Sequence, residues 1–218
     1  MEDEIIEIGS PFAVKKVILL HGLTGTASAI RPVAEYLHKR LGEDYFFILP
    51  TAPIIKVKQF NGEPVHAWFD VKSSDFRKEI DLDGIYKSSA RIASLIRAEV
   101  SQGVSPKDIF LGGFSQGGVI VLTTALLEPY AVGGVFALSS YLPLEDQLTN
   151  QLTEASKEVP IFQAVSLRDE FISQEMSEKS SEFLRYRGNA VHVTKYDMKH
   201  EIRNKELDDV SEWIKALV

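Results

Sequence analysis

The sequence contains no cysteine. Disulfide bonds, thiolate metal sites and cysteine nucleophiles are therefore excluded. Positive charge is also scarce, because 24 Lys and Arg stand against 31 Asp and Glu in 218 residues, giving a net charge of −7. This balance argues against nucleic acid, and against a strongly anionic membrane surface, as a partner.

Long apolar runs are missing too. No stretch approaches the roughly 20 residues that span a bilayer. The acidic start Met1-Glu2-Asp3-Glu4 lacks the basic region of a signal peptide. The sequence therefore predicts a cytoplasmic protein without stable membrane insertion. Its 44% hydrophobic and 25% charged residues predict one domain over residues 1–218.

Apolar runs alternate with helix-like segments along the chain. Strands are expected at 5–8, 14–20, 45–49, 108–111, 134–138, 160–167 and 190–196. Helices are expected at 29–41, 81–102, 119–127, 174–187 and 206–218, with a partly helical connection at 143–158. Residues 17–20 are apolar at every position, which is typical of a strand covered on both faces. The pattern predicts an α/β fold with a mostly parallel central sheet covered by helices on both faces.

The stretch 54–80 has no clear periodicity, yet it carries Phe60, Trp68, Phe69 and Phe76. A loop of this length in a compact domain is usually functional or disordered. Because the aromatic residues argue against disorder, we expect a long active-site loop at 54–80.

Residues Gly113-Phe114-Ser115-Gln116-Gly117 spell G-x-S-x-G. This motif is the nucleophile elbow of α/β-hydrolases, in which a strand turns into a helix at a strained serine. Glycines two residues before and after the serine leave room for the strand and the helix to pack closely. The expected strand at 108–111 and helix at 119–127 supply this context, so Ser115 is the expected nucleophile.

A serine hydroxyl needs a base to remove its proton, and the sequence has five histidines. His200 follows the last expected strand, in a polar loop at the carboxyl end of the sheet, and is the best candidate. His21 ends the first buried strand and is expected to bond loop backbone. His38 is expected to be solvated on its helix. His66 could line a pocket, and His192 lies within a strand.

The base needs an acidic partner that fixes its tautomer, and α/β-hydrolases place that acid between the serine and the histidine in the sequence. Asp169 comes directly after a buried strand, at the same edge of the sheet. Its neighbour Glu170 is the main competitor. Weaker candidates are Glu145 and Asp146 on the polar connection, and Asp197 close to the base.

Acyl transfer also needs hydrogen-bond donors placed in advance for the oxyanion. One is expected to be the backbone N–H of Gln116, after the nucleophile. The other should come from the loop after the first strong strand. Leu23 is the best candidate there, and the donor could lie one residue away.

Several motifs resemble the carboxylesterase/acyl-protein thioesterase family, also called the phospholipase/carboxylesterase family. They lie at residues 17–23, 49–53, 67–70, 111–118 and 137–143, and the likeness covers nearly the whole chain. The resemblance implies an α/β-hydrolase fold with Ser115 as nucleophile, Asp169 as acid and His200 as base. It also implies hydrolysis of carboxylic esters or thioesters without a metal or cofactor.

The sequence departs from the family pattern at three places. Residues 164–167 stand where a His-Gly pair usually precedes the acid, and residues 170–173 stand where small aliphatic residues and a proline are usual. The oxyanion loop has Thr24-Gly25-Thr26 where a Gly-Asp or Gly-Ala-like turn is commoner. All three are expected to border the cleft, so they bear on substrate preference.

An apolar groove for an acyl chain is the substrate hypothesis. Trp68, Phe114 and Met198 are the suggested contacts. Further apolar residues for this groove are Leu23, Ile54, Ile55, Val57 and Phe60. The expected partner is an ester or thioester with an acyl chain, and a homodimer is left open. A carboxylesterase, a lysophospholipase and an acyl-protein thioesterase all fit.

Two other interpretations remain. One is a hydrolase-fold binding protein without significant catalysis, which the loss of a catalytic residue would favour. The other is an enzyme similar to dienelactone hydrolases, but these typically use a cysteine nucleophile, which this sequence lacks.

Overall fold

The computed structural model describes residues 4–72 and 79–218. Residues 1–3 of the acidic start and Phe76 of the expected long loop lie outside the described residues. The strands are β1 (Ile5–Ile8), β2 (Lys15–Leu20), β3 (Tyr45–Pro50), β4 (Ile54–Val57), β5 (Glu63–His66), β6 (Ile109–Phe114), β7 (Gly134–Leu138), β8 (Ile161–Ser166) and β9 (Val191–Tyr196). The helices are α1 (Ala27–Leu41), α2 (Leu82–Ser101), α3 (Gln116–Leu127), α4 (Asp146–Thr149), α5 (Gln174–Arg187) and α6 (Asn204–Lys215), with short 3-10 helices at Lys58–Phe60, Pro106–Asp108 and Ala155–Glu158.

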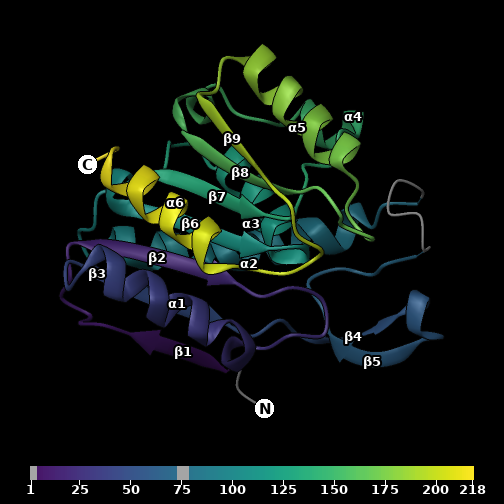
Figure 1. Cartoon of the computed structure of the whole chain (residues 1–218), viewed down its shortest axis with the longest axis horizontal. Helices are drawn as coiled ribbons and strands as arrows, with labels where there is room; N and C mark the ends of the chain where they lie inside the picture. Colours follow the sequence, from purple (N-terminus) through teal and green to yellow (C-terminus); the bar gives the residue numbers. More distant parts are fainter. Residues whose placement is uncertain (1–3, 73–78) are drawn as a thin grey trace.

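A central sheet organises the molecule (Figure 1). In the described part of the chain it has seven strands, in the order β1-β3-β2-β6-β7-β8-β9. Strand β1 runs antiparallel to β3, and the other neighbouring pairs are parallel. The prediction of a mostly parallel sheet is therefore confirmed.

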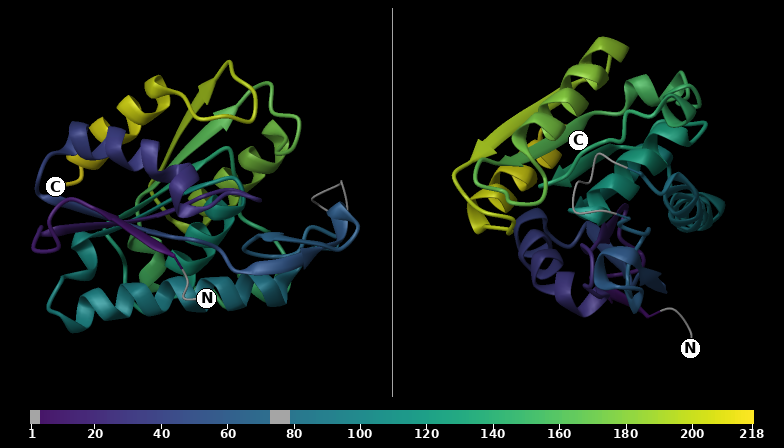
Figure 2. Two further views of the ribbon diagram at one scale, coloured as in Figure 1. Left: turned by 90° about the horizontal axis from the view of Figure 1, so that it is seen from below. Right: turned by 90° about the vertical axis from the view of Figure 1, so that its right-hand side faces the viewer.

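Helices cover both faces of this sheet (Figure 2). Successive side chains of a strand point to opposite faces, and β2 shows the result. Val17 and Leu19 pack in one apolar cluster with α1 and α6. Ile18 and Leu20 pack in a second cluster with α2, α3 and α5. A strand buried on both faces must be apolar throughout, which explains the uninterrupted run in the sequence.

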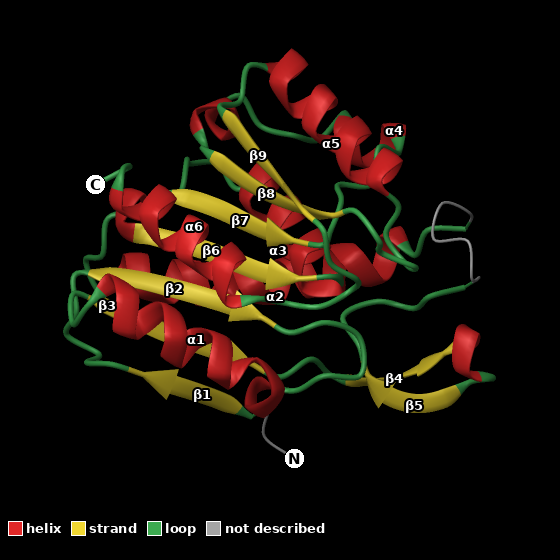
Figure 3. Ribbon diagram, viewed as in Figure 1, coloured by secondary structure: helices red, strands yellow, loops and turns green. Residues whose placement is uncertain are grey.

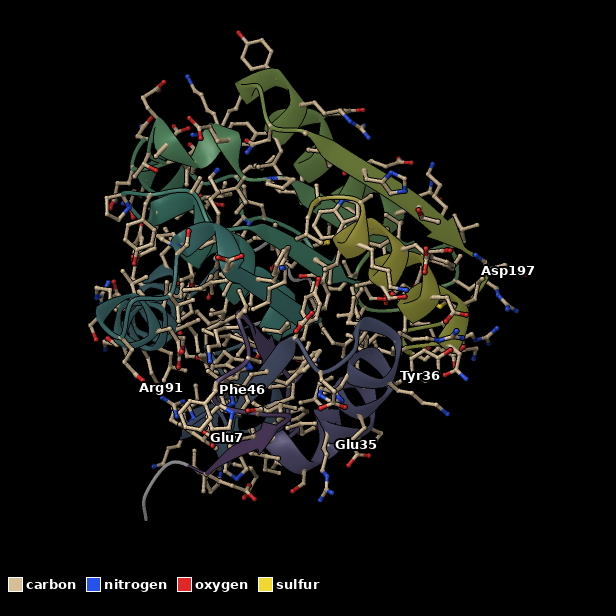
Figure 4. All side chains as sticks on the ribbon, turned by 90° about the vertical axis from the view of Figure 1, so that its left-hand side faces the viewer. Glu7, Glu35, Tyr36, Phe46, Arg91 and Asp197 are labelled. Carbon is tan, nitrogen blue, oxygen red and sulfur yellow. The ribbon has the colours of Figure 1, made fainter. Side chains whose placement is uncertain are left out.

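Helices α1 and α6 lie side by side on one face. The hydroxyl of Tyr36 donates to Asp208 Oδ1 at 2.8 Å, and Figure 4 shows Tyr36 on the side of α1 that is turned toward α6. Because α6 follows the loop that carries His200, this packing fixes the far end of that loop. Within residues 4–72 and 79–218, no helix is both long enough and apolar enough to cross a membrane.

The expected long loop is partly ordered as a hairpin. Strands β4 and β5 pair antiparallel and lie beyond the arrowheads of β2, β6 and β7, at the carboxyl end of the sheet (Figure 3). The hairpin turns at Asn61 and Gly62, whose φ angles are 56° and 80°. These two residues end a five-residue loop, 58–62, that joins the strands, and Asn and Gly are the residues that adopt positive φ most readily. The sequence pattern does not predict this hairpin, because β4 and β5 are only four residues long.

Candidate active site

Ser115 is the single residue between β6 and α3. Its φ of 55° and ψ of −119° are unfavourable for a residue with a side chain, at a cost of about 1–3 kcal/mol. A Cβ added to Gly113 would lie 2.3 Å from the backbone carbon of Gly117. A Cβ on Gly117 would lie 2.6 Å from the carbonyl oxygen of His21. Only glycine therefore fits at either position, and helix α3 begins at Gln116, three residues earlier than expected.

Three side chains form a continuous hydrogen-bonded row. Ser115 Oγ lies 2.9 Å from His200 Nε2, and His200 Nδ1 lies 2.7 Å from Asp169 Oδ2. The imidazole accepts from the serine hydroxyl when its Nδ1–H donates to the carboxylate. The row is largely buried, since Ser115 is 8% exposed and the Asp169 side chain is 1% exposed.

The topology of the sheet brings these residues together. Ser115 follows β6, Asp169 follows β8 and His200 follows β9, all at the carboxyl edge. With neighbouring strands roughly 4.8 Å apart, β9 is separated from β6 by roughly 14 Å. The segment between β9 and α6 must therefore lean back over the ends of β8 and β7 to place His200 beside Ser115.

The carboxylate of Asp169 is held by its own turn. Asp169 Oδ1 accepts the backbone N–H groups of Phe171 at 2.8 Å and Ile172 at 2.9 Å. This leaves Oδ2 for His200. The competing acids lie elsewhere: Glu170 pairs with Lys199 at 3.3 Å, and Asp197 pairs with Arg168 at 2.7 Å. Both are more than 60% exposed, and Glu145 and Asp146 are exposed as well.

His21 secures the loop that carries Leu23, which confirms its expected structural role. Its Nδ1–H donates to the carbonyl of Gly22 at 2.7 Å, and its Nε2 accepts from Ala52 N–H at 2.9 Å. Burial lowers the pKa of His21 to about 4, so the ring stays neutral and Nε2 remains an acceptor at neutral pH. On the other side of Leu23, Thr24 N–H donates to the carbonyl of His66 at 2.8 Å.

The remaining histidines have other surroundings. His38 packs edge-on against Phe47, with ring centroids 6.1 Å apart, and its side chain is only 17% exposed. The expectation that His38 is solvated is therefore wrong, because it lies on the side of α1 that covers the sheet. The Nδ1–H of His66 donates to the carbonyl of Ala52 at 2.7 Å, and His66 does not line the cleft described next. His192 stacks on Phe162.

A cleft of about 230 Å³ opens over Ser115. It is lined by Gly22, Leu23, Thr24, Gln59, Phe60, Phe114, Ser115, Gln116, Phe171 and His200. The lining is mostly apolar, with the polar row at one side. The hairpin contributes Gln59 and Phe60, so part of the predicted active-site loop does border this cleft. Gln59 was not among the predicted site residues, and the neighbouring Asn61-Gly62 pair is the sequence signal that could have placed it in a hairpin loop.

Two aromatic rings flank the imidazole of His200. The ring of Phe114 is 4.7 Å away and that of Phe171 is 5.2 Å away, between centroids. Phe171 belongs to the segment 170–173, where the sequence departs from the family pattern. Trp68 and Met198, which were suggested as substrate contacts, are instead 1% exposed and are not among the residues that line the cleft.

Trp68 has a supporting position. Its indole Nε1–H donates to the carbonyl of His21 at 2.8 Å, and its ring lies 5.1 Å from that of His21. It therefore packs beneath the loop of Leu23. Among the described residues, no group of three or more His, Asp or Glu side chains is arranged to hold a metal ion.

Comparison with known proteins places the chain in a family. The family model of phospholipases and carboxylesterases matches residues 1–218. Carboxylesterase SOBER1 of Arabidopsis thaliana is 29% identical over 202 residues, covering 91% of this chain and 89% of that protein. Acyl-protein thioesterase 1 of Emericella nidulans is 31% identical over 214 residues, covering 93% of this chain and 90% of that protein.

Solved structures of related proteins have the same fold. The crystal structure of Arabidopsis thaliana SOBER1 superposes with a TM-score of 0.88 at 28% identity, covering 93% of this chain and 98% of that one. Acyl-protein thioesterase 2 of Zea mays gives a TM-score of 0.84 at 24% identity, with 98% of each chain covered. From the match over its whole length, the chain belongs to the phospholipase/carboxylesterase family of α/β-hydrolases.

Proposed function

We propose that this protein is a serine hydrolase that cleaves carboxylic esters or thioesters through an acyl-enzyme, with Ser115, His200 and Asp169 as its catalytic triad. The observation that carries the proposal is the 2.9 Å contact between Ser115 Oγ and His200 Nε2, two residues that line a mostly apolar cleft. The carboxylesterase and thioesterase names of the relatives support the same class of reaction.

The first half-reaction forms the acyl-enzyme. Ser115 Oγ attacks the substrate carbonyl carbon while its proton moves to His200 Nε2. Asp169 stabilises the imidazolium that results. The backbone N–H groups of Leu23 and Gln116 are the proposed donors to the oxyanion. Gln116 N–H suits this role because it is the first N–H group of α3. The first N–H groups of a helix have no carbonyl acceptor within the helix, so this group is available to the oxyanion. His200 then returns the proton to the departing alcohol or thiol.

The second half-reaction regenerates the serine. Water gives a proton to His200 and attacks the acyl carbon. The tetrahedral adduct then collapses, the bond between the acyl carbon and Ser115 Oγ breaks, and His200 returns the proton to Oγ as the carboxylic acid leaves. Neither half-reaction requires a cofactor. The apolar side of the cleft, formed by Leu23, Phe60, Phe114 and Phe171, suits the acyl chain.

Rates on p-nitrophenyl esters of increasing acyl length test the acyl site. A buried methylene is worth about 0.8 kcal/mol, so kcat/KM is expected to rise about fourfold per methylene until the cleft is filled, and then to fall. Phe60→Ala is expected to flatten this rise. Phe12→Ala is the matched control, because Phe12 is 93% exposed and does not line the cleft. Equal rates for all lengths in the wild-type protein would contradict the acyl site.

The alternative function, a hydrolase-fold binding protein without significant catalysis, would bind the same esters without turnover. No observation on the described residues favours it, because all members of the row are present and in contact. The cytoplasmic location and the absence of nucleic acid as a partner stay predictions from the sequence, which leaves a homodimer open.

A further inference from the structure

The peptide unit between Ser115 and Gln116 is restrained from its carbonyl side. This unit is planar, so the Ser115 carbonyl and the Gln116 N–H point in opposite directions. The carbonyl accepts from the hydroxyl of Ser140 at 2.8 Å, and from Val119 N–H of α3 at 3.2 Å. Turning the N–H out of its present direction would therefore break the bond from Ser140.

Ser140 is itself fixed. It lies just after β7 and is 0% exposed. Its carbonyl accepts from Gln163 Nε2 at 3.2 Å and from Ser177 Oγ at 2.9 Å. A Cβ on Gly118 would lie only 2.4 Å from Ser140 Cβ, so the serine packs directly against the first turn of α3. Its hydroxyl cannot follow the Ser115 carbonyl if that carbonyl swings away.

The side chain of Gln116 restrains the same peptide unit from the other end. Gln116 is 4% exposed. Its Oε1 accepts from Trp68 N–H at 3.1 Å, and its Nε2 donates to the carbonyl of Phe69 at 2.9 Å. These partners cannot shift easily, because the Trp68 carbonyl also accepts from Ser88 Oγ. The Cα of Gln116 is thus held from a segment almost 50 residues away in the sequence.

Such restraint matters because Ser115 has an unfavourable backbone conformation, with φ at 55°. Rotation of the following peptide changes the ψ of Ser115 from −119° and can bring the residue toward the left-handed helical region, where ψ is about +47°. The same rotation would turn the Gln116 N–H away from the reacting carbonyl. We propose that Ser140, together with the side chain of Gln116, is a positioning residue that holds the Gln116 N–H toward the oxyanion. The bond from Ser140 also polarises the peptide, which makes its N–H a stronger donor. This inference rests on the proposed function.

Ser140→Ala tests the inference with a matched control. The change removes the hydroxyl but keeps the Cβ that packs on Gly118. We expect kcat for a p-nitrophenyl ester to fall about five- to tenfold with KM within about twofold. Affinity for an aryl trifluoromethyl ketone, which forms a tetrahedral adduct, should fall by a similar factor. Affinity for the corresponding methyl ketone, which stays trigonal, should not change.

Ser139→Ala is the control, because Ser139 is equally buried and its hydroxyl pairs with Ser166 Oγ at 2.7 Å, away from the peptide in question. It should lower Tm as Ser140→Ala does, while keeping wild-type kcat and ketone affinities. Gln116→Met, a near-isosteric change, should act like Ser140→Ala, and it serves where Ser140→Ala does not fold.

An active wild-type enzyme whose Ser140→Ala and Gln116→Met variants lose only Tm would overturn this inference alone. A wild-type protein that neither hydrolyses the ester nor binds the trifluoromethyl ketone would overturn the proposed function, and this inference with it.

Discussion

Replacing Asp169 by asparagine is expected to lower kcat about 10⁴-fold, the size of effect that the equivalent change has in serine proteases. The geometry explains why. Asp169 Oδ1 accepts the N–H groups of Phe171 and Ile172, and asparagine has only one oxygen with which to do so. Its NH₂ group must then face His200 Nδ1. The imidazole becomes an acceptor at Nδ1 and carries its proton on Nε2, where it can no longer take the proton of Ser115.

Glu170→Gln is the matched control for this change. Glu170 is the adjacent acid, but it is 66% exposed and pairs with Lys199, so the variant should keep wild-type kcat. Steady-state rates on one p-nitrophenyl ester compare the three proteins directly. A large loss in Glu170→Gln with little loss in Asp169→Asn would show that the acid has been assigned to the wrong residue.

Gly113→Ala is expected to lower the free energy of unfolding by more than about 3 kcal/mol, or to prevent folding. The added Cβ would lie 2.3–2.5 Å from backbone atoms of Gly117 and Gly118, and backbone cannot move aside as a flexible side chain can. Strand β6 and helix α3 would have to separate, and the turn at Ser115 would open. Urea unfolding monitored by tryptophan fluorescence gives the free energy.

Gly103→Ala is the control for this clash, because it adds backbone strain without a steric clash. Gly103 has a φ of 94°, but a Cβ there would meet no atom within 4 Å. Its substitution should cost only about 1–2 kcal/mol. If both variants lose the same free energy of unfolding, the close approach of β6 and α3 at Gly113 is not what makes glycine necessary.

The three residues of the hydrogen-bonded row could be predicted because each has a recognisable sequence pattern beside it. Ser115, Asp169 and His200 each follow an apolar strand within a few residues, and parallel strands present their carboxyl ends at a common edge. The bounds of β7 and α5 were predicted to the residue, since an apolar run ends cleanly in one case and Gly188 ends the helix in the other.

Other features depend on contacts between distant segments. Trp68 looked like a substrate contact because it is aromatic and lies in a long irregular stretch. It is buried because Gln116, His21 and Ser88 all bond to it, and these residues are 20–48 positions away. No local pattern in the sequence encodes such a set of partners. The hydrogen bond from Ser140 to the Ser115 carbonyl could not be predicted from the sequence for the same reason.

Activation of Ser115 by His200 can be tested from the mass of the protein after reaction with a fluorophosphonate. Attack by Ser115 Oγ displaces fluoride and leaves one phosphonyl group on the protein. We expect a single adduct, located on Ser115 by peptide mapping, and none in Ser115→Ala. An adduct on another residue, or equal labelling of Ser115→Ala, would contradict it.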